Sequence, residues 1–156
     1  MDRRTLLAAG LTPLLPRSVR GAGERVILGV IGTRGRGRGL AEGFARLPDA
    51  RVKWLCDVDR SSFGAATAVE KAQGQAPTLV EDFRRVLDDP EVDAVVIATP
   101  DHWHALMTLH ACAAGKDVYV EKPCSHTVQE GRMMIEAARA TRRVVQVGTQ
   151  RRSSPD

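Results

Sequence analysis

A short strand pattern that runs into a glycine-dense turn and then a helical pattern constrains the fold of this chain most strongly. The stretch at 26–39 reads V-I-L-G-V-I-G-T-R-G-R-G-R-G. Its apolar, β-branched run ends at Gly32, and Leu40, Phe44 and Leu47 then recur at helical spacing. Glycines permit positive φ and a close backbone approach to a ligand, and the free N–H groups at a helix start favour a phosphate. The stretch therefore predicts a strand, a tight turn and a helix that cradle a pyrophosphate.

The match to the G-x-G-x-x-G motif lacks its middle glycine. With Gly32 first and Gly37 last, Arg34 occupies the position that normally lets the backbone approach a diphosphate. Either Gly35 takes over this role or Arg34 itself meets the phosphates, and a plain tight turn also fits the pattern. Asp57 favours the nucleotide interpretation, because it follows the next strand pattern at about the position where a dinucleotide fold places the carboxylate for the ribose hydroxyls. Such a carboxylate favours NAD over NADP.

The composition is that of an ordinary globular protein and argues against a nucleic-acid partner. The 156 residues are 43% apolar and 27% charged, which is enough for one core and one domain. Residues 1–25 hold five arginines against two carboxylates, so they carry +3 of the net charge of +4. The remaining basic cluster, Arg34, Arg36 and Arg38, fits a local phosphate site better than a surface for a polyanion.

Neither the cysteines nor the apolar runs predict a metal site, a disulfide framework or a membrane span. Cys56, Cys112 and Cys124 lack metal-ligand spacing and are odd in number, so we expect small core residues. Cys124 directly follows a motif described below. No run of 18 or more apolar residues is present, which excludes an ordinary transmembrane helix.

The first 24 residues resemble a twin-arginine export signal. Arg3 and Arg4 precede a short apolar stretch, and a candidate cleavage region lies around 21–23. This interpretation predicts a periplasmic or secreted protein, and the alternative is a disordered leader on a cytoplasmic one. We therefore exclude residues 1–24 from the fold prediction.

Beyond Glu24, apolar runs alternate with helical patterns, which is typical of a parallel sheet with crossover helices. The expected strands are 25–31, 51–56, 77–80, 93–98, 117–121 and 143–147. The expected helices are 37–47, 60–73, 82–88, 102–114 and 127–141, the last with a capping box formed by Thr127 and Glu130. Six strands and five crossovers predict a doubly wound α/β fold, the Rossmann fold, with sheet order 3-2-1-4-5-6. Right-handed crossovers place all carboxyl ends of the strands at one edge, where we expect the site.

The fourth strand pattern ends in polar and aromatic residues at that edge. They are Thr99, Pro100, Asp101, His102, Trp103 and His104. The two histidines lack the i, i+4 spacing of a metal pair and have no evident third ligand, so no metal is predicted. One interpretation is a helix cap with surface histidines, and the other is the lining of a cofactor crevice.

The fifth strand pattern ends in Glu121, Lys122 and Pro123. A lysine there could donate a hydrogen bond or a proton to a substrate hydroxyl near a nicotinamide, with Glu121 holding it in position and tuning its pKa. The alternative is a strand that ends in a surface salt bridge.

Together these motifs resemble the amino-terminal half of the Gfo/Idh/MocA oxidoreductases, and most closely the group with twin-arginine leaders. The resemblance covers about residues 25–152 and rests on the glycine-rich run, C-D-V-D at 56–59, A-T-P-D-H-W-H at 98–104, V-Y-V-E-K-P at 118–123 and Q-V-G-T-Q-R-R at 146–152. It implies an enzyme that uses NAD to transfer hydride to or from a carbon of a sugar or polyol that bears a hydroxyl.

The resemblance also implies roles for individual residues. Lys122 would be the catalytic residue of this half, and Gln150 and Arg151 would lie at the exit toward a second domain. The cofactor-binding residues would be Gly32, Thr33, Arg34, Gly35, Arg36 and Gly37 at the pyrophosphate, Asp57 at the ribose, Thr99, Pro100, Asp101 and His104 at the nicotinamide, and Glu121, Lys122 and Pro123 between cofactor and substrate.

Members of this family resemble one another in having a larger carboxyl-terminal α/β domain, which supplies the substrate pocket and much of an oligomer interface. We therefore expect 25–150 to form the nucleotide-binding domain and 151–156 to begin the linker to that second domain. The chain would then be a fragment or a truncated gene product of a homo-oligomeric enzyme. Two alternatives are a redox-cycling, NAD-dependent glycoside hydrolase and a nucleotide-binding module without catalysis.

Overall fold

Six parallel strands form one sheet in the order β3-β2-β1-β4-β5-β6, as the sequence predicts. The computed structural model describes residues 25–152. The strands are β1 (Val26–Ile31), β2 (Ala50–Cys56), β3 (Thr78–Val80), β4 (Ala94–Ile97), β5 (Asp117–Glu121) and β6 (Val145–Gly148). The helices are α1 (Gly35–Ala45), α2 (Ala66–Gln73), α3 (Arg84–Leu87), α4 (His104–Ala113) and α5 (Val128–Thr141), with 3-10 turns η1 (Arg60–Ala65), η2 (Asp101–Trp103) and η3 (Gln150–Arg152).

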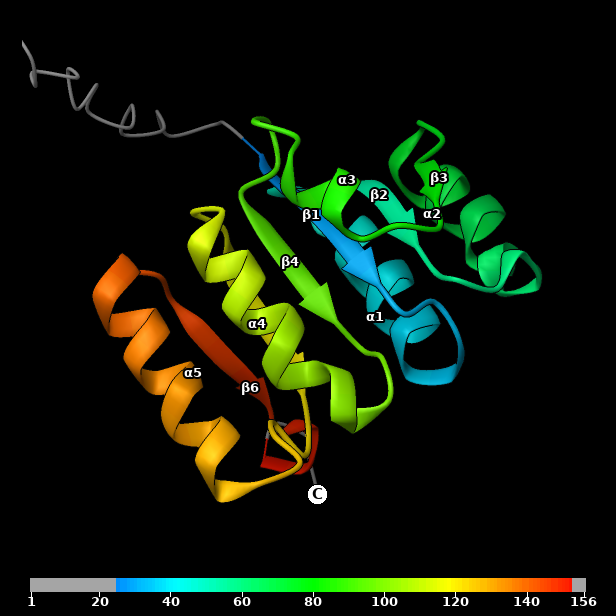
Figure 1. The fold of residues 1–156 in the computed structure, drawn as a ribbon. Coiled ribbons are helices and arrows are strands. Elements are labelled where there is room, and N and C mark those ends of the chain that lie inside the picture. The colour runs from blue at the N-terminus through cyan, green and yellow to red at the C-terminus, as the bar shows by residue number, and fades with distance from the viewer. Residues whose placement is uncertain (1–24, 153–156) are drawn as a thin grey trace, which may run out of the picture.

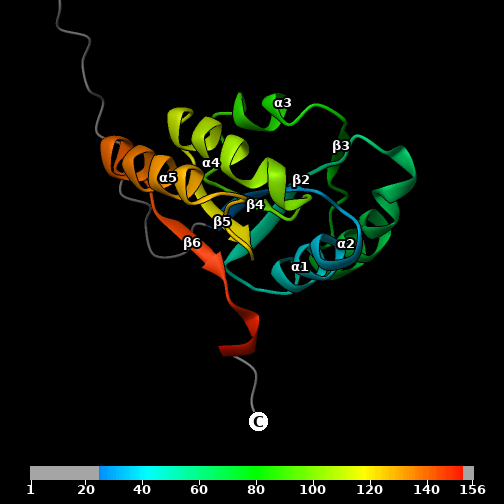
Figure 2. The ribbon, with the colours of Figure 1, turned by 60° about the horizontal axis from the view of Figure 1, so that its bottom comes forward.

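The helices cover both faces of the sheet. In Figure 2, α1 and α2 lie on one face, and α3, α4 and α5 lie on the other. The strand order reverses between β1 and β4, so the chain leaves these two adjacent strands toward opposite faces. In such folds a crevice opens between the two loops at the carboxyl edge, and that crevice is where ligands bind.

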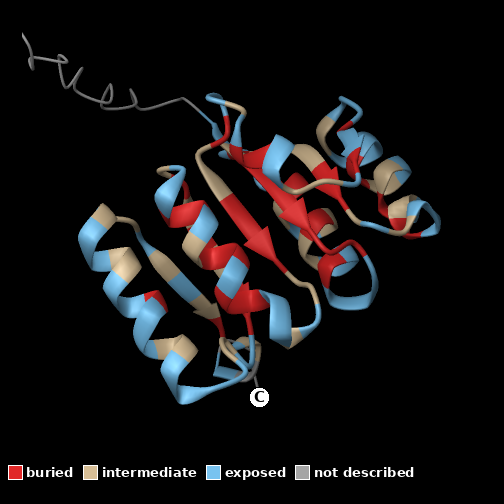
Figure 3. Cartoon of the chain, in the orientation of Figure 1, coloured by how far each residue is buried: buried red, intermediate tan, exposed pale blue. Residues whose placement is uncertain are grey.

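Successive side chains of the central strands point to opposite faces of the sheet, so a separate hydrophobic core forms on each face. Val30 and Val96 pack with the helices α1 and α2, whereas Ile31 and Ile97 pack with α4. All four side chains are at most 2% exposed, and Figure 3 shows β1 and β4 as the most deeply buried strands. Because both faces of these strands are covered, their sequences are continuously apolar.

Three helices differ from the sequence prediction in ways that affect the site, and one is the expected helix at 102–114, which is divided into η2 and α4. Helix α1 begins at Gly35, two residues earlier than expected, because the preceding Arg34 is extended and the first turn lies within the glycine-rich run. The expected helix at 60–73 is divided into η1 and α2. The Asp59 side chain accepts a hydrogen bond from the backbone of Ser61 and so starts a 3-10 turn. The capping box of Thr127 and Glu130 at α5 is confirmed.

Polar side chains at the amino edge of the sheet form hydrogen bonds and ion pairs with one another. The buried Lys116 donates to the carbonyl oxygens of Asp89 (2.6 Å) and Val92 (2.9 Å). The Asp89 carboxylate accepts from Lys53 Nζ and Trp54 Nε1, each at 2.6 Å. Burial acts to raise the pKa of Asp89, but the hydrogen bonds from Lys53 and Trp54 outweigh it and leave the pKa below its ordinary value. These contacts among neighbouring residues stabilise the amino edge of the sheet.

Three expectations concern membranes, thiols and the leader. Within residues 25–152, no helix is both long and apolar enough to span a bilayer. Cys56 and Cys112 are free and buried, as expected of core residues, and Cys124 is free and half-buried. The export-signal prediction for 1–24 lies outside the described residues and stays a prediction.

Candidate dinucleotide and catalytic site

The glycine-rich turn packs so closely that two of its positions exclude a side chain. Gly32 has φ +84°, and a Cβ there would lie 2.7 Å from the carbonyl carbon and oxygen of Ala98. A Cβ at Gly37 would lie 1.8 Å from the carbonyl oxygen of Gly32. Gly35 has φ +42° but no atom within 4 Å of its potential Cβ. The turn is therefore closed toward the sheet and open toward the cleft at Gly35.

Asp57 fastens this turn to the end of β2. Its Oδ2 accepts a hydrogen bond from the backbone N of Thr33 at 2.8 Å and lies 3.3 Å from the Thr33 hydroxyl. Its Oδ1 accepts from the backbone N of Asp59 at 3.0 Å. The carboxylate thus holds the turn in shape, and it also lines a cavity at the carboxyl edge of the sheet.

Arg34 points along the rim of the cleft. Its guanidinium pairs with the carboxylate of Asp59, and its Nε donates to the hydroxyl of Ser62 at 2.7 Å. Hydrogen bonds from Ser61 and the charge of Arg34 hold the pKa of Asp59 below its ordinary value. The altered motif allowed either the backbone at Gly35 or the side chain of Arg34 to approach the phosphates. Because Arg34 is already paired, this geometry favours the backbone at Gly35.

Two adjoining cavities occupy the carboxyl edge of the sheet. The larger, of about 840 Å³, is lined by residues that follow β1, β2, β3 and β4. The smaller, of about 260 Å³, is lined by residues that follow β4 and β5, and both cavities include Ala98 and Thr99. The larger volume lies within the range of small-molecule and cofactor sites.

The predicted site residues divide between these cavities. Gly32, Arg34, Gly35, Asp57, Thr99 and Pro100 line the larger, and Arg36, Thr99, Asp101, His104, Glu121, Lys122, Pro123 and Gln150 line the smaller. Thr33 and Gly37 lie buried beneath the turn and support it from behind.

His104 joins the ends of β4 and β5. The side chain is 2% exposed, with Nδ1 2.7 Å from the carbonyl oxygen of Pro123 and Nε2 2.9 Å from that of Thr99. The interpretation of both histidines as surface residues is therefore wrong for His104, whereas His102 is exposed. His104 fixes the two loops between which the smaller cavity opens.

Glu121 pairs with Arg36 and does not form the expected ion pair with Lys122. Glu121 is 5% exposed, and its Oε1 accepts from Arg36 Nε at 2.8 Å. Among the described residues, the Lys122 ammonium forms no ion pair, and it is exposed at the smaller cavity. The peptide bond between Lys122 and Pro123 is cis.

Asp101 belongs to an exposed polar group at the start of α4. His126 Nδ1 lies 3.4 Å from Asp101 Oδ2, and this contact keeps the pKa of Asp101 below its ordinary value. In the part of the chain that the structure describes, no group of three His, Cys, Asp or Glu side chains is arranged to hold a metal.

Sequence reasoning missed several residues that line the larger cavity. Glu81 follows β3 as Asp57 follows β2, so its place after a strand was the available signal. Phe83 and Met107 supply apolar surface, and Met107 Sδ lies 3.9 Å from the Thr99 hydroxyl. No local pattern distinguishes these two from ordinary core residues.

The sheet order, the closed glycine turn and the carboxylate after β2 define a dinucleotide-binding Rossmann domain. A family model described as "Oxidoreductase family, NAD-binding Rossmann fold" matches residues 26–149. The chain therefore belongs to the Gfo/Idh/MocA family, as the motifs predicted, and NAD is its cofactor.

Relatives and solved structures agree with this assignment. The chain is 35% identical over 139 residues to an inositol 2-dehydrogenase of Rubrobacter xylanophilus, covering 88% of this chain and 39% of that protein. It is 34% identical over 125 residues to a glycosyl hydrolase family 109 protein of a Shewanella species, covering 77% of this chain and 27% of that protein. A levoglucosan dehydrogenase in complex with NADH has a TM-score of 0.68 at 26% identity, over 80% of this chain and 34% of that one. The chain thus spans well under half the length of these proteins.

Proposed function

We propose that this chain is the NAD-binding part of an oxidoreductase that transfers hydride between the nicotinamide and a carbon of a sugar or polyol that bears a hydroxyl. The observation that carries the proposal is the pair of adjoining cavities, with Asp57 at one and Lys122 at the other. A dinucleotide laid across the strand ends from Asp57 would bring its nicotinamide toward Lys122. The inositol 2-dehydrogenase relative supports a polyol substrate.

In this proposal the chain binds and orients the cofactor and supplies one side chain that takes part in proton transfer. The open backbone at Gly35 and the free N–H groups at the start of α1 would hold the pyrophosphate. The bound nicotinamide supplies the position that accepts or gives the hydride. The Lys122 ammonium would donate a hydrogen bond to the substrate oxygen and take part in its proton transfer.

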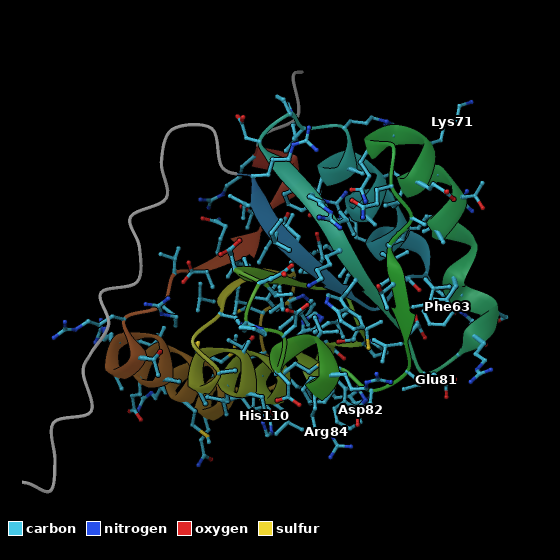
Figure 4. The ribbon with its side chains drawn as sticks, turned by 90° about the horizontal axis from the view of Figure 1, so that it is seen from above. Phe63, Lys71, Glu81, Asp82, Arg84 and His110 are labelled. Atoms are coloured by element: carbon cyan, nitrogen blue, oxygen red, sulfur yellow. The ribbon has the colours of Figure 1, made fainter. Side chains whose placement is uncertain are left out.

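We infer a preference for NAD over NADP from the charges around the larger cavity. Asp57 would accept ribose hydroxyls and repel a 2′-phosphate. Two nearby arginines that could attract such a phosphate are already paired, Arg60 with Glu81 and Arg84 with Asp82, the latter at 2.7 Å. Figure 4 shows Glu81, Asp82 and Arg84 close together beyond the end of β3.

Calorimetric titration of the chain with NAD and with NADP tests this proposal. NAD should bind more tightly, and Asp57→Ala should weaken NAD binding by about 1.5–3 kcal/mol, roughly 10- to 150-fold, as expected for hydrogen bonds to a charged group. Asp88→Ala removes an exposed carboxylate after α3, toward the amino edge, and should leave the affinity unchanged. NADP affinity equal to or above that of NAD would contradict the inferred preference.

A second candidate function is suggested by the family 109 glycosyl hydrolase relative. An enzyme of that kind would use bound NAD transiently and regenerate it, so glycoside cleavage would proceed without net NADH. The two functions can be separated by joining residues 25–152 to the carboxyl-terminal part of a relative. Sugar-dependent accumulation of NADH would support the dehydrogenase, and glycoside cleavage at constant NAD would support the hydrolase.

A further inference from the structure

Glu121 is a buried carboxylate whose position is tightly enclosed. It is the last residue of β5 and lies opposite Gly148 of β6 in the parallel register. A Cβ at Gly148 would lie 2.8 Å from Glu121 Oε1 and 2.6 Å from the hydroxyl of Tyr119. The glycine therefore makes room for this carboxylate, and any side chain at this position would crowd it.

Arg36 neutralises this carboxylate from a distant part of the sequence. The two residues are 85 positions apart, and Arg36 Nε lies 2.8 Å from Glu121 Oε1. The hydrogen bond to Glu121, aided by Tyr119, holds the pKa of Arg36 above its ordinary value. Since Arg36 is the second residue of α1, this ion pair fastens the glycine-rich turn to the end of β5, across β4.

The other oxygen of Glu121 faces the residue that carries the proposed chemistry. Glu121 Oε2 lies 3.3 Å from the backbone N of Lys122 and accepts its hydrogen bond. Arg36 and Lys122 line the same small cavity. Because the Lys122 ammonium forms no ion pair among the described residues, its position depends on the backbone that Glu121 holds.

We propose that Arg36 is a positioning residue that orients Lys122 through Glu121. As a result, the glycine-rich turn that would hold the pyrophosphate and the lysine proposed for proton transfer move together. This inference rests on the proposed role of Lys122. The guanidinium has five N–H donors, so Arg36 can hold Glu121 through Nε, interact with the hydroxyl of Tyr119 and still line the smaller cavity.

The physical argument depends on the burial of Glu121 rather than on the strength of the pair itself. Arg36 is 45% exposed, and such a half-exposed pair adds little by itself. Removal of Arg36, however, leaves the Glu121 carboxylate buried without a counter-charge, and this costs free energy of folding. The Glu121 carboxylate would then shift toward another donor, and the Lys122 backbone N–H that it accepts from would move with it.

Nuclear magnetic resonance of the lysine side chains tests this inference without cofactor or turnover. The chain has four lysines, Lys53, Lys71, Lys116 and Lys122, so growth on lysine enriched in carbon-13 at the ε carbon gives four signals. The Lys122 signal is identified by its absence in Lys122→Arg. In Arg36→Gln, the Lys122 signal should shift by more than its linewidth while those of Lys53 and Lys71 stay in place.

The double variant decides whether Arg36 acts through Glu121. Glu121→Gln should also shift the Lys122 signal, and Arg36→Gln should add no further shift in that background. Arg38→Gln is the matched control, because Arg38 lies on the same helix and pairs with Glu42 at 2.9 Å on the surface. An unchanged Lys122 signal in Arg36→Gln, or additive shifts in the double variant, would overturn the inference.

The same samples separate this inference from the proposed function. Addition of NAD should shift the Lys122 signal of the unsubstituted chain, and this response should be lost in Arg36→Gln if the turn and the lysine move as one unit. A chain that fails to bind NAD would refute the proposed function, while the comparison of variants without cofactor would still decide the role of Arg36.

Discussion

At the scale of single residues, Cys56 shows how strongly burial controls reactivity at the edge of the site. It ends β2 directly before Asp57. Burial raises the pKa of the Cys56 thiol to about 12, and the nearby carboxylates of Asp57 and Asp82 add to the effect. Since the thiolate is the reactive form, only about one thiol in ten thousand would be ionised at pH 8.

We predict that iodoacetamide at pH 8 modifies the half-buried Cys124 first and leaves Cys56 intact in the folded chain. Peptide mass spectrometry after timed labelling measures the two rates. In denaturant, where burial is lost, the rates at both cysteines should converge. Rapid modification of Cys56 under native conditions would contradict the assigned environment.

Residues that carry chemistry differ in how far the sequence could place them. Asp57 and Lys122 each follow a strand, and parallel strands bring their carboxyl ends to one edge, so both positions could be predicted. The partner of Glu121 could not be predicted, because the choice between Arg36 and Lys122 depends on side-chain direction across 85 positions of sequence. The contacts of the His104 ring could not be predicted for the same reason, since only the folded loops bring two carbonyl oxygens to it.

At the scale of elements, α1 provides a matched pair of glycines. A Cβ at Gly37 would overlap the carbonyl oxygen of Gly32, whereas a Cβ at Gly43 meets nothing within 4 Å. We predict that Gly37→Ala destabilises the chain by about 2 kcal/mol or more, because α1 must move away from the turn. Gly43→Ala should stabilise it by about 0.5–1 kcal/mol, because alanine favours a helix.

Urea unfolding followed by circular dichroism measures both effects. The two variants carry the same substitution in the same helix, so propensity alone would raise both midpoints. A midpoint for Gly37→Ala equal to that of Gly43→Ala would contradict the close approach of α1 to the turn.

The order of the elements followed from hydrophobic periodicity, but their ends did not. Apolar runs located all six strands, and the central strands β1 and β4 gave the clearest signal because they are buried on both faces. The division of 60–73 into η1 and α2 was missed because it depends on one hydrogen bond, which the Asp59 side chain accepts from the backbone N of Ser61. The early start of α1 was missed because glycines give no helical pattern to count.

At the scale of the whole molecule, we predict that this 156-residue chain binds NAD but does not oxidise a sugar or polyol. The groups that would hold a substrate beside Lys122 are expected from the part of the relatives that this chain does not span. Absorbance of NADH in the presence of polyols measures turnover. Steady, polyol-dependent NADH formation by this chain would contradict the prediction.

In a fusion of residues 25–152 with the carboxyl-terminal part of a dehydrogenase relative, Lys122→Ala should lower kcat by about 10²- to 10⁴-fold, which is typical of a lost proton-transfer group. The affinity for NAD should stay within a few-fold, because Lys122 lines the smaller cavity beyond the ribose site. Turnover that survives the substitution would remove Lys122 from the mechanism.

The sequence of the first 24 residues allows a prediction about location. Because Arg3 and Arg4 precede a short apolar stretch, we predict export by the twin-arginine route, with removal of about 23 residues. Changing both arginines to lysine should retain the protein in the cytoplasm. Fractionation and mass spectrometry of the amino terminus measure both effects, and a cytoplasmic protein that keeps Met1 to Gly23 would refute the assignment.

The two tryptophans of the chain occupy very different surroundings. Trp54 is held at the amino edge by its 2.6 Å hydrogen bond to Asp89, whereas Trp103 is 43% exposed and lines the larger cavity. A molecule that enters the cavity therefore contacts one indole and leaves the other in constant surroundings. The protein thus contains a natural fluorescent reporter with an internal reference, and Trp103→Phe would leave only the reference.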